Sequence, residues 1–155
     1  MEKFVISDNH FNHYNIIQYC DRPFKTTEEM NAYMIAQWNK TVSHGDLVYH
    51  LGDFGFGRFE SLQNIFNQLN GEKILIMGNH DRRLGGVSVW TRLGFIEVHK
   101  ELIIDNKILS HYPLMSIPNN MINYHGHIHN NITEGLNARH INYSVEMFDY
   151  IPQPF

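Results

Sequence analysis

The chain has 155 residues, of which 43% are hydrophobic and 18% are charged. This composition is typical of a folded domain and excludes an intrinsically disordered chain. The formal net charge of -4 excludes a strong general attraction to the nucleic acid backbone, although bound cations would reverse the sign locally. The single cysteine, Cys20, excludes an internal disulfide and a thiolate metal cluster.

We expect one domain over residues 1–155, because this length suits a single core and no repeat or Pro/Ser-rich linker divides the chain. The N-terminus lacks the basic region and apolar stretch of a signal peptide. No segment has the apolar length that is needed to cross a bilayer. We therefore expect a cytoplasmic protein with no membrane partner.

The first half of the sequence alternates expected strands and helices. A short apolar run predicts a buried strand at 3–7. Thr26, with Glu29 three residues later, forms the capping-box pattern that opens a helix reaching Trp38. Further along the chain we expect a strand at 47–51, a helix at 61–69, a strand at 73–77 and a short helix near 89–93.

The second half is predicted to be mostly strand. The expected strands are 95–99, 102–104, 108–110, 121–125 and 141–147, with a tight hairpin at Asp105-Asn106. An alternating first half followed by strands predicts an α/β sandwich that is built on mixed sheets.

Ligand-type side chains follow the expected strands at the points where the apolar runs stop. These residues are Asp8, Asp53, Asn79, His111 and His127. In open α/β sheets, sites form beyond the carboxyl ends of the strands, where loops converge. The sequence also holds eleven histidines, and imidazole is the commonest metal ligand in proteins. These observations predict a metal site at one rim.

Most of the individual motifs are weak evidence. Asp8 and His10 would point to the same side of an extended segment and could grip a cation, but a capping Asp beside a surface His is commoner. Gly52-Asp53 is an ordinary turn dipeptide. Gly78-Asn79-His80-Asp81 could supply an amide ligand, a histidine that acts on a proton and a carboxylate that fixes its tautomer, or could be a simple turn. Gly126-His127-Ile128-His129, with two imidazoles after a glycine, is the strongest local signal for a metal site.

In this order, and with the single His111 at a strand end between the last two, these motifs resemble the five signature blocks of the calcineurin-like metallophosphoesterase superfamily. The resemblance runs from Asp8 to His129, and the flanking residues look similar to the small single-domain members of bacteria and phages. It implies a four-layer α-β-β-α sandwich of mixed sheets, with a dimetal site at the carboxyl ends of the strands. The chain departs from the pattern at Phe54, where many members carry an acidic residue or Asn.

The resemblance also implies roles for single residues. One metal would be held by Asp8, His10, Asp53 and His129, and the other by Asp53, Asn79, His111 and His127, so that Asp53 bridges the pair. His80 would be the catalytic histidine, with Asp81 as its orienting partner. This implies a phosphoesterase in which a metal-bridging hydroxide attacks phosphorus and His80 donates a proton to the departing oxygen.

Oxygen and nitrogen donors suit Mn²⁺, Fe, Ni²⁺ or Zn²⁺, and we expect two Mn²⁺ ions because the family most often uses Mn²⁺ or a mixed pair. The chain is too short for a large capping domain, so we expect an open groove and a phosphodiesterase, with nucleotides or nucleic acid as candidate substrates. The alternatives are a phosphomonoesterase or nuclease on the same site, or a non-catalytic metal-binding scaffold. The presence of His80 and of every expected ligand favours catalysis.

Two further residues are candidates for substrate contacts. His13 lies on the same loop as His10. Arg22, in the stretch Asp21-Arg22-Pro23-Phe24-Lys25, could fork onto a phosphate while Phe24 stacks on a base. A surface turn with a buried Phe24 explains the same stretch equally well. His50 lies inside an apolar run and is expected to be a hydrogen-bonded core residue.

Overall fold

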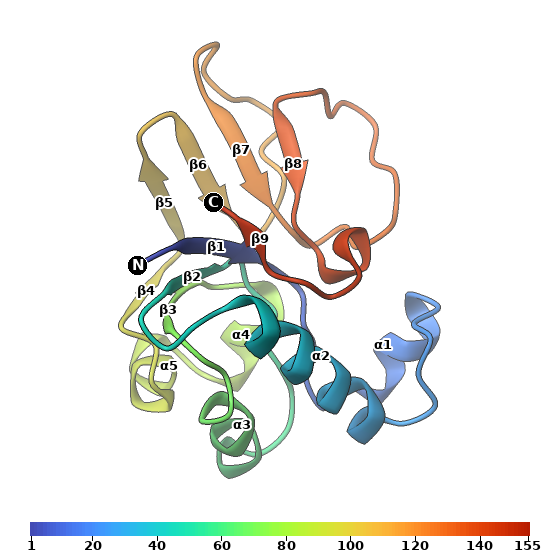
Figure 1. Cartoon of the computed structure of the whole chain (residues 1–155). Helices are drawn as coiled ribbons and strands as arrows, with labels where there is room; N and C mark the ends of the chain where they lie inside the picture. Colours follow the sequence, from blue (N-terminus) through green and yellow to red (C-terminus); the bar gives the residue numbers. More distant parts are fainter.

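Buried apolar strands form the centre of the molecule, which a computed structural model describes over all 155 residues (Figure 1). Two sheets pack face to face, one with strand order β4-β3-β2-β1-β9 and one with order β5-β6-β7-β8. The strands are β1 (Lys3–Ile6), β2 (Leu47–His50), β3 (Glu72–Ile76), β4 (Glu97–His99), β5 (Glu101–Ile104), β6 (Lys107–Ser110), β7 (Ile122–His125), β8 (His140–Asn142) and β9 (Gln153–Pro154).

Both sheets are mixed. In the five-stranded sheet β1, β2, β3 and β4 pair in parallel, and β9 is antiparallel to β1. In the four-stranded sheet β6, β7 and β8 are parallel, and β5 forms an antiparallel hairpin with β6. The central strands β1, β2 and β3 are buried almost along their whole length, as expected for strands that are covered on both faces.

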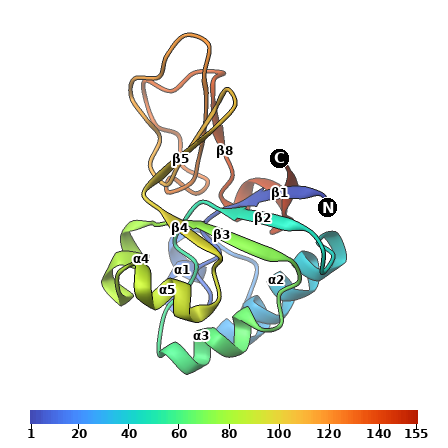
Figure 2. The same ribbon diagram turned by 90° about the vertical axis from the view of Figure 1, so that its left-hand side faces the viewer.

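The helices cover one face of the five-stranded sheet (Figures 1 and 2). They are α1 (Tyr14–Tyr19), α2 (Thr27–Thr41), α3 (Phe59–Phe66), α4 (Asn79–Leu84) and α5 (Val87–Leu93). In α2, the predicted apolar stripe of Met30, Met34 and Trp38 is fully buried. The predicted cap is confirmed, because the side chain of Thr26 accepts the backbone N–H of Glu29 at 3.1 Å.

The second sheet covers the opposite face of the first sheet. Leu109 and Tyr124 of the second sheet belong to the same buried cluster as Val5 and Tyr49 of the first. The expected α/β sandwich of two mixed sheets is therefore confirmed, with its helical layer on one side. The outer face of the second sheet is covered by a loop without helix, which follows β6. This loop is attached to β7, because the backbone N–H of Leu114 donates to Asn123 Oδ1 at 2.9 Å.

Four elements differ from the sequence-based expectations. Helices α1 and α4 and strand β9 were not expected, and the strand expected at 141–147 ends at Asn142. A 3₁₀ helix, η1 (Val145–Phe148), follows it, because Ser144 turns toward β1 and its hydroxyl donates to Asp8 Oδ2 at 3.0 Å. No helix has the length and apolar character that are required to span a membrane.

Candidate metal centre

The ligand-type residues that follow the strands meet at one rim of the molecule. Asp8, Asp53 and Asn79 follow β1, β2 and β3 of the first sheet. His111 follows β6, and the loop after β7 carries His127 and His129. Since these strands are parallel within each sheet, their carboxyl ends bring all six side chains to the same edge.

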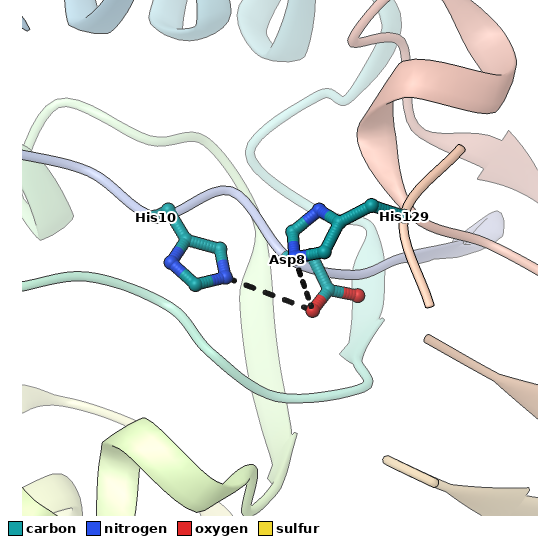
Figure 3. A group of neighbouring side chains, drawn as sticks. All are labelled: Asp8, His10 and His129. Atoms are coloured by element: carbon teal, nitrogen blue, oxygen red, sulfur yellow. Dashed lines mark ion pairs between the residues drawn. The ribbon is translucent and has the colours of Figure 1, made fainter. Parts of the chain in front are cut away.

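Asp8, His10 and His129 form the first group of candidate ligands (Figure 3). Asp8 Oδ1 lies 3.8 Å from His10 Nε2 and 3.8 Å from His129 Nε2. Both Asp8 Oδ1 and His10 Nε2 are buried and have no hydrogen-bond partner. Buried polar atoms are normally hydrogen-bonded, so this pair fits a cation that would satisfy both atoms.

Asp53, His111 and His127 form the second group, which Asn79 completes. His111 Nε2 lies 3.4 Å from Asp53 Oδ2, 3.0 Å from Asn79 Oδ1 and 3.2 Å from His127 Nδ1. The other ring nitrogen of His111, Nδ1, donates to the carbonyl of Leu51 at 2.8 Å. This hydrogen bond fixes the ring so that Nε2 faces the group.

Asp53 joins the two groups through a single oxygen. Its Oδ2 lies 3.5 Å from His10 Nε2 in the first group and 3.4 Å from His111 Nε2 in the second. Its Oδ1 accepts the backbone N–H of His80 at 2.9 Å, which fixes the direction of the carboxylate. The two groups are therefore the same two sets that the resemblance implies, with Asp53 between them.

The backbone of the rim is held in the left-handed region at many non-glycine residues. Among them are Asp8 (φ 59°), His10 (φ 52°), Asp53 (φ 55°), His127 (φ 70°) and His129 (φ 51°). Asp8 and His10 were expected on an extended segment, and that geometry is wrong. The left-handed turns aim the side chains instead, at a cost in strain that is typical of functional sites.

Glycines occupy the positions where two rim loops touch. A Cβ atom on Gly52 would lie 2.6 Å from the backbone nitrogen of Gly78 and 2.7 Å from His111 Nδ1. A Cβ atom on Gly78 would overlap the carboxylate of Asp53, and one on Gly126 would overlap Ser7 Oγ and Asp8 Oδ2. The glycines of the motifs are therefore required by the close approach of backbone to candidate ligands.

The electrostatics of the rim favour positive charge. Burial alone would raise the pKa of Asp8, but His10 beside it and the charges of His111 and His129 hold it well below its usual value. Burial would lower the pKa of His129, but Cys20, Glu146 and Asp8 raise it to about 10. The pKa of His111 is raised to about 9, against the effect of burial, chiefly by Asp53. Buried carboxylates thus make this rim a good host for cations.

His80 lies beside both groups, but Asp81 does not orient it as expected. His80 Nε2 is 3.9 Å from Asp53 Oδ2, while its Nδ1 is buried without a partner. The carboxylate of Asp81 instead accepts the backbone N–H groups of Gly78 (2.8 Å), Asp53 (2.7 Å) and Phe54 (3.0 Å). Asp81 therefore caps α4 and holds the Asp53 loop.

Arg22 is buried, and its five N–H groups are used inside the protein. They donate to the carbonyls of Asp8 and Asn9, to Met30 Sδ and to the Glu146 carboxylate. The expected contact between Arg22 and a substrate phosphate does not agree with this placement, because no donor is left for the phosphate.

The other candidates of the sequence reasoning are also placed. Phe24 packs against the core, with its ring centroid 5.2 Å from that of Tyr150. This placement agrees with the alternative in which Phe24 packs inward and does not stack on a base. His13 lies at the rim, its Nδ1 3.1 Å from His10 Nδ1 and its ring stacked on Phe56. His50 is a core residue, as expected, and its Nε2 lies 2.9 Å from Asn9 Oδ1.

Two residues that contact the candidate ligands were missed by the sequence reasoning. Ser144 donates to Asp8, and Glu146 Oε1 lies 3.0 Å from His129 Nδ1. Both residues fall within the stretch that was expected to be a strand at 141–147. No motif marks them, because their partners are distant in the sequence.

Comparisons with known proteins agree with this geometry. A family model described as calcineurin-like phosphoesterase matches residues 3–152. The uncharacterized protein MJ1445 of Methanocaldococcus jannaschii is 36% identical over 96% of this chain and 84% of its own length. AQ665 from Aquifex aeolicus, a protein of unknown function, has 30% sequence identity to this chain. Its crystal structure superposes with a TM-score of 0.76, and the match covers 98% of this chain and 94% of AQ665. Nuclease MPE of Pseudomonas putida shares the fold at 20% identity, with a TM-score of 0.55 over 82% of this chain and 60% of that one.

The close approach at Gly126 leads to a testable prediction. Gly126→Ala should lower both the melting temperature and the metal content of the protein, because the new methyl group would push Asp8 and Ser7 out of place. Gly45→Ala is the matched control, since a Cβ atom there meets nothing within 4 Å. We expect the control to be neutral or stabilising by about 0.4–1 kcal/mol. A Gly126→Ala protein with unchanged melting temperature and metal content would contradict the packing described here.

Proposed function

The chain belongs to the calcineurin-like phosphoesterase family, and from this premise we propose that it is a dimetal-dependent phosphodiesterase. The observation that carries the proposal is the position of Asp53 Oδ2, which lies within 3.5 Å of a candidate ligand nitrogen from each of the two groups. A carboxylate oxygen that is shared in this way suits two cations bound side by side.

The proposed metal ligands are the residues of the two groups. Asp8, His10 and His129 would hold one ion, Asn79, His111 and His127 the other, and Asp53 both. When bound, two divalent cations supply Lewis-acid activation of the phosphate ester and of a water molecule. The donors are oxygen and nitrogen only, which suits Mn²⁺, our first choice, and also Fe, Ni²⁺ or Zn²⁺.

His80 is the proposed proton donor to the departing oxygen. Its Nε2 faces Asp53 Oδ2, and its side chain is 25% exposed, so that a substrate at the rim can reach it. The backbone N–H of His80 is bound to Asp53, and the ring of Phe56 lies 4.9 Å from its own. These contacts hold the imidazole beside the candidate ligands, where a positioned acid contributes about 10²–10⁴-fold to the rate.

The exposure of side chains at the rim supports a diester substrate. The side chains of His80 and His129 are 25% and 13% exposed, so a substrate with a large group on each side of the phosphate can approach them. Tyr112, which is 42% exposed, lies with its ring centroid 4.3 Å from that of His127 and offers a stacking surface for a base. The structural neighbour MPE is a nuclease, which is in line with nucleotide or nucleic acid diesters as substrates.

A non-catalytic scaffold on the same fold is the alternative of a different class. Such a scaffold would need the ligands to bind metal but would make no use of a proton donor. The position of His80 beside the candidate ligands favours catalysis, and its substitution separates the two functions.

One prediction of the proposed function concerns the number of metal ions. The wild-type protein loaded with Mn²⁺ should hold two ions per chain, and Asp53→Asn should lose most of the metal and nearly all activity, because one carboxylate serves both groups. Asp105→Asn, at an exposed hairpin position, is the control and should keep both ions. Elemental analysis of the purified proteins measures this. A wild-type protein that never exceeds one ion per chain would rule out the two-metal proposal.

Another prediction of the proposed function separates catalysis from metal binding. His80→Ala should keep both ions but slow the hydrolysis of diesters with poor leaving groups by about 10²-fold or more. An activated aryl diester, whose leaving group needs little protonation, should suffer less. His44→Ala, at an exposed position, should leave both rates unchanged. Equal losses with both substrates would count against His80 as the acid.

A further inference from the structure

A buried chain of hydrogen bonds runs from Arg22 through Glu146 to His129. We infer that Arg22 and Glu146 are positioning residues, which hold the His129 imidazole in the one tautomer and orientation that can bind a metal ion together with Asp8 and His10. The inference rests on the proposed metal centre.

The carboxylate of Glu146 defines which nitrogen of His129 is free. Glu146 Oε1 lies 3.0 Å from His129 Nδ1, and an ionised carboxylate can only accept hydrogen bonds. The proton of the imidazole is therefore placed on Nδ1. The opposite nitrogen, Nε2, points to Asp8 Oδ1 at 3.8 Å and is the nitrogen that can bind a metal ion once it has released its own proton (Figure 3).

Arg22 in turn holds Glu146. Its Nε and one terminal nitrogen donate to Glu146 Oε1 at 2.9 and 2.7 Å. The two side chains are 0% and 5% exposed, and a buried carboxylate of this kind is costly unless a cation neutralises it. The planar guanidinium does this and also fixes the direction of the carboxylate.

The same guanidinium reaches the first metal loop. Its two terminal nitrogens donate to the backbone carbonyls of Asp8 and Asn9, both at 2.8 Å. Arg22 thus ties Asp8, which has a left-handed backbone, to the residue that orients His129. Two candidate ligands of one ion, from loops at opposite ends of the sequence, are held by one side chain. A lysine has a single point charge and cannot reproduce this fork.

A third metal ion is the rival explanation of these contacts. Donor atoms of Cys20, His129 and Glu146 lie within 4.8 Å of one another, and Glu146 Oε2 is buried without a partner. The positive charge of Arg22, bound directly to the same carboxylate, opposes a cation there. The positioning role uses the Arg22 contacts, whereas a third ion would have to overcome them.

The test is a titration with Mn²⁺, measured by isothermal calorimetry, of the 155-residue protein and four variants. Glu146→Ala removes the acceptor and should lower the affinity for one of the two ions about 10–100-fold, while the affinity for the other ion is unchanged. Glu146→Gln keeps an oxygen in the same place and should recover part of the loss. Arg22→Lys keeps the positive charge but loses the planar, multiply donating guanidinium, and should also lower the affinity for one ion. Glu97→Ala breaks an exposed Glu97–His99 pair of 2.7 Å and should change nothing.

A second measurement needs no metal and keeps the inference distinct from the proposed function. In metal-free protein, the Nδ1 proton of His129 should give a protected downfield NMR signal in wild type and Glu146→Gln, and none in Glu146→Ala. If wild type binds fewer than two ions but shows this signal, the proposed function fails while the orientation of His129 stands. Wild-type affinity for both ions in folded Glu146→Ala would overturn the inference. The inference would also be overturned if the wild-type protein bound three ions per chain and Cys20→Ser bound only two.

Discussion

Two buried carboxylates, Asp8 and Asp53, lie close together at the rim of the sandwich, and their negative charge must be matched there. Removing an ion from water costs several kcal/mol unless opposite charge is supplied nearby. The histidines of the rim point at these two carboxylates, and the left-handed backbone turns and close glycine contacts bring them within reach. The local structure is thus organised around charge that two divalent cations would balance.

The candidate ligands come from both sheets. Asp8, His10, Asp53 and Asn79 lie in loops of the first sheet, and His111, His127 and His129 in loops of the second. Each proposed ion therefore has donors on both sides of the interface between the sheets. Metal binding should stabilise the packing of one sheet on the other, because ligands from both halves are held at one point.

The sequence was sufficient for features that depend on near neighbours. The strands β1, β2 and β3 are short apolar runs, and the Thr26 cap and α2 stripe depend on residues three or four apart. The five ligand-type residues Asp8, Asp53, Asn79, His111 and His127 are visible in the sequence because each follows the end of an apolar run. The sequence could not show that Asp81 bonds to the Asp53 loop, or that Arg22 pairs with Glu146, which is 124 positions away. Such contacts depend on the folded topology, which is why Arg22 was expected at the surface.

The proposed function depends on two cations at the rim, with Asp53 between them. A crystal structure of Mn²⁺-loaded protein, with anomalous diffraction measured at the manganese edge, tests this most directly. We predict two anomalous peaks, one among Asp8, His10 and His129 and one among Asn79, His111 and His127, both in contact with Asp53. A single peak, or a peak that does not touch Asp53, would contradict the account.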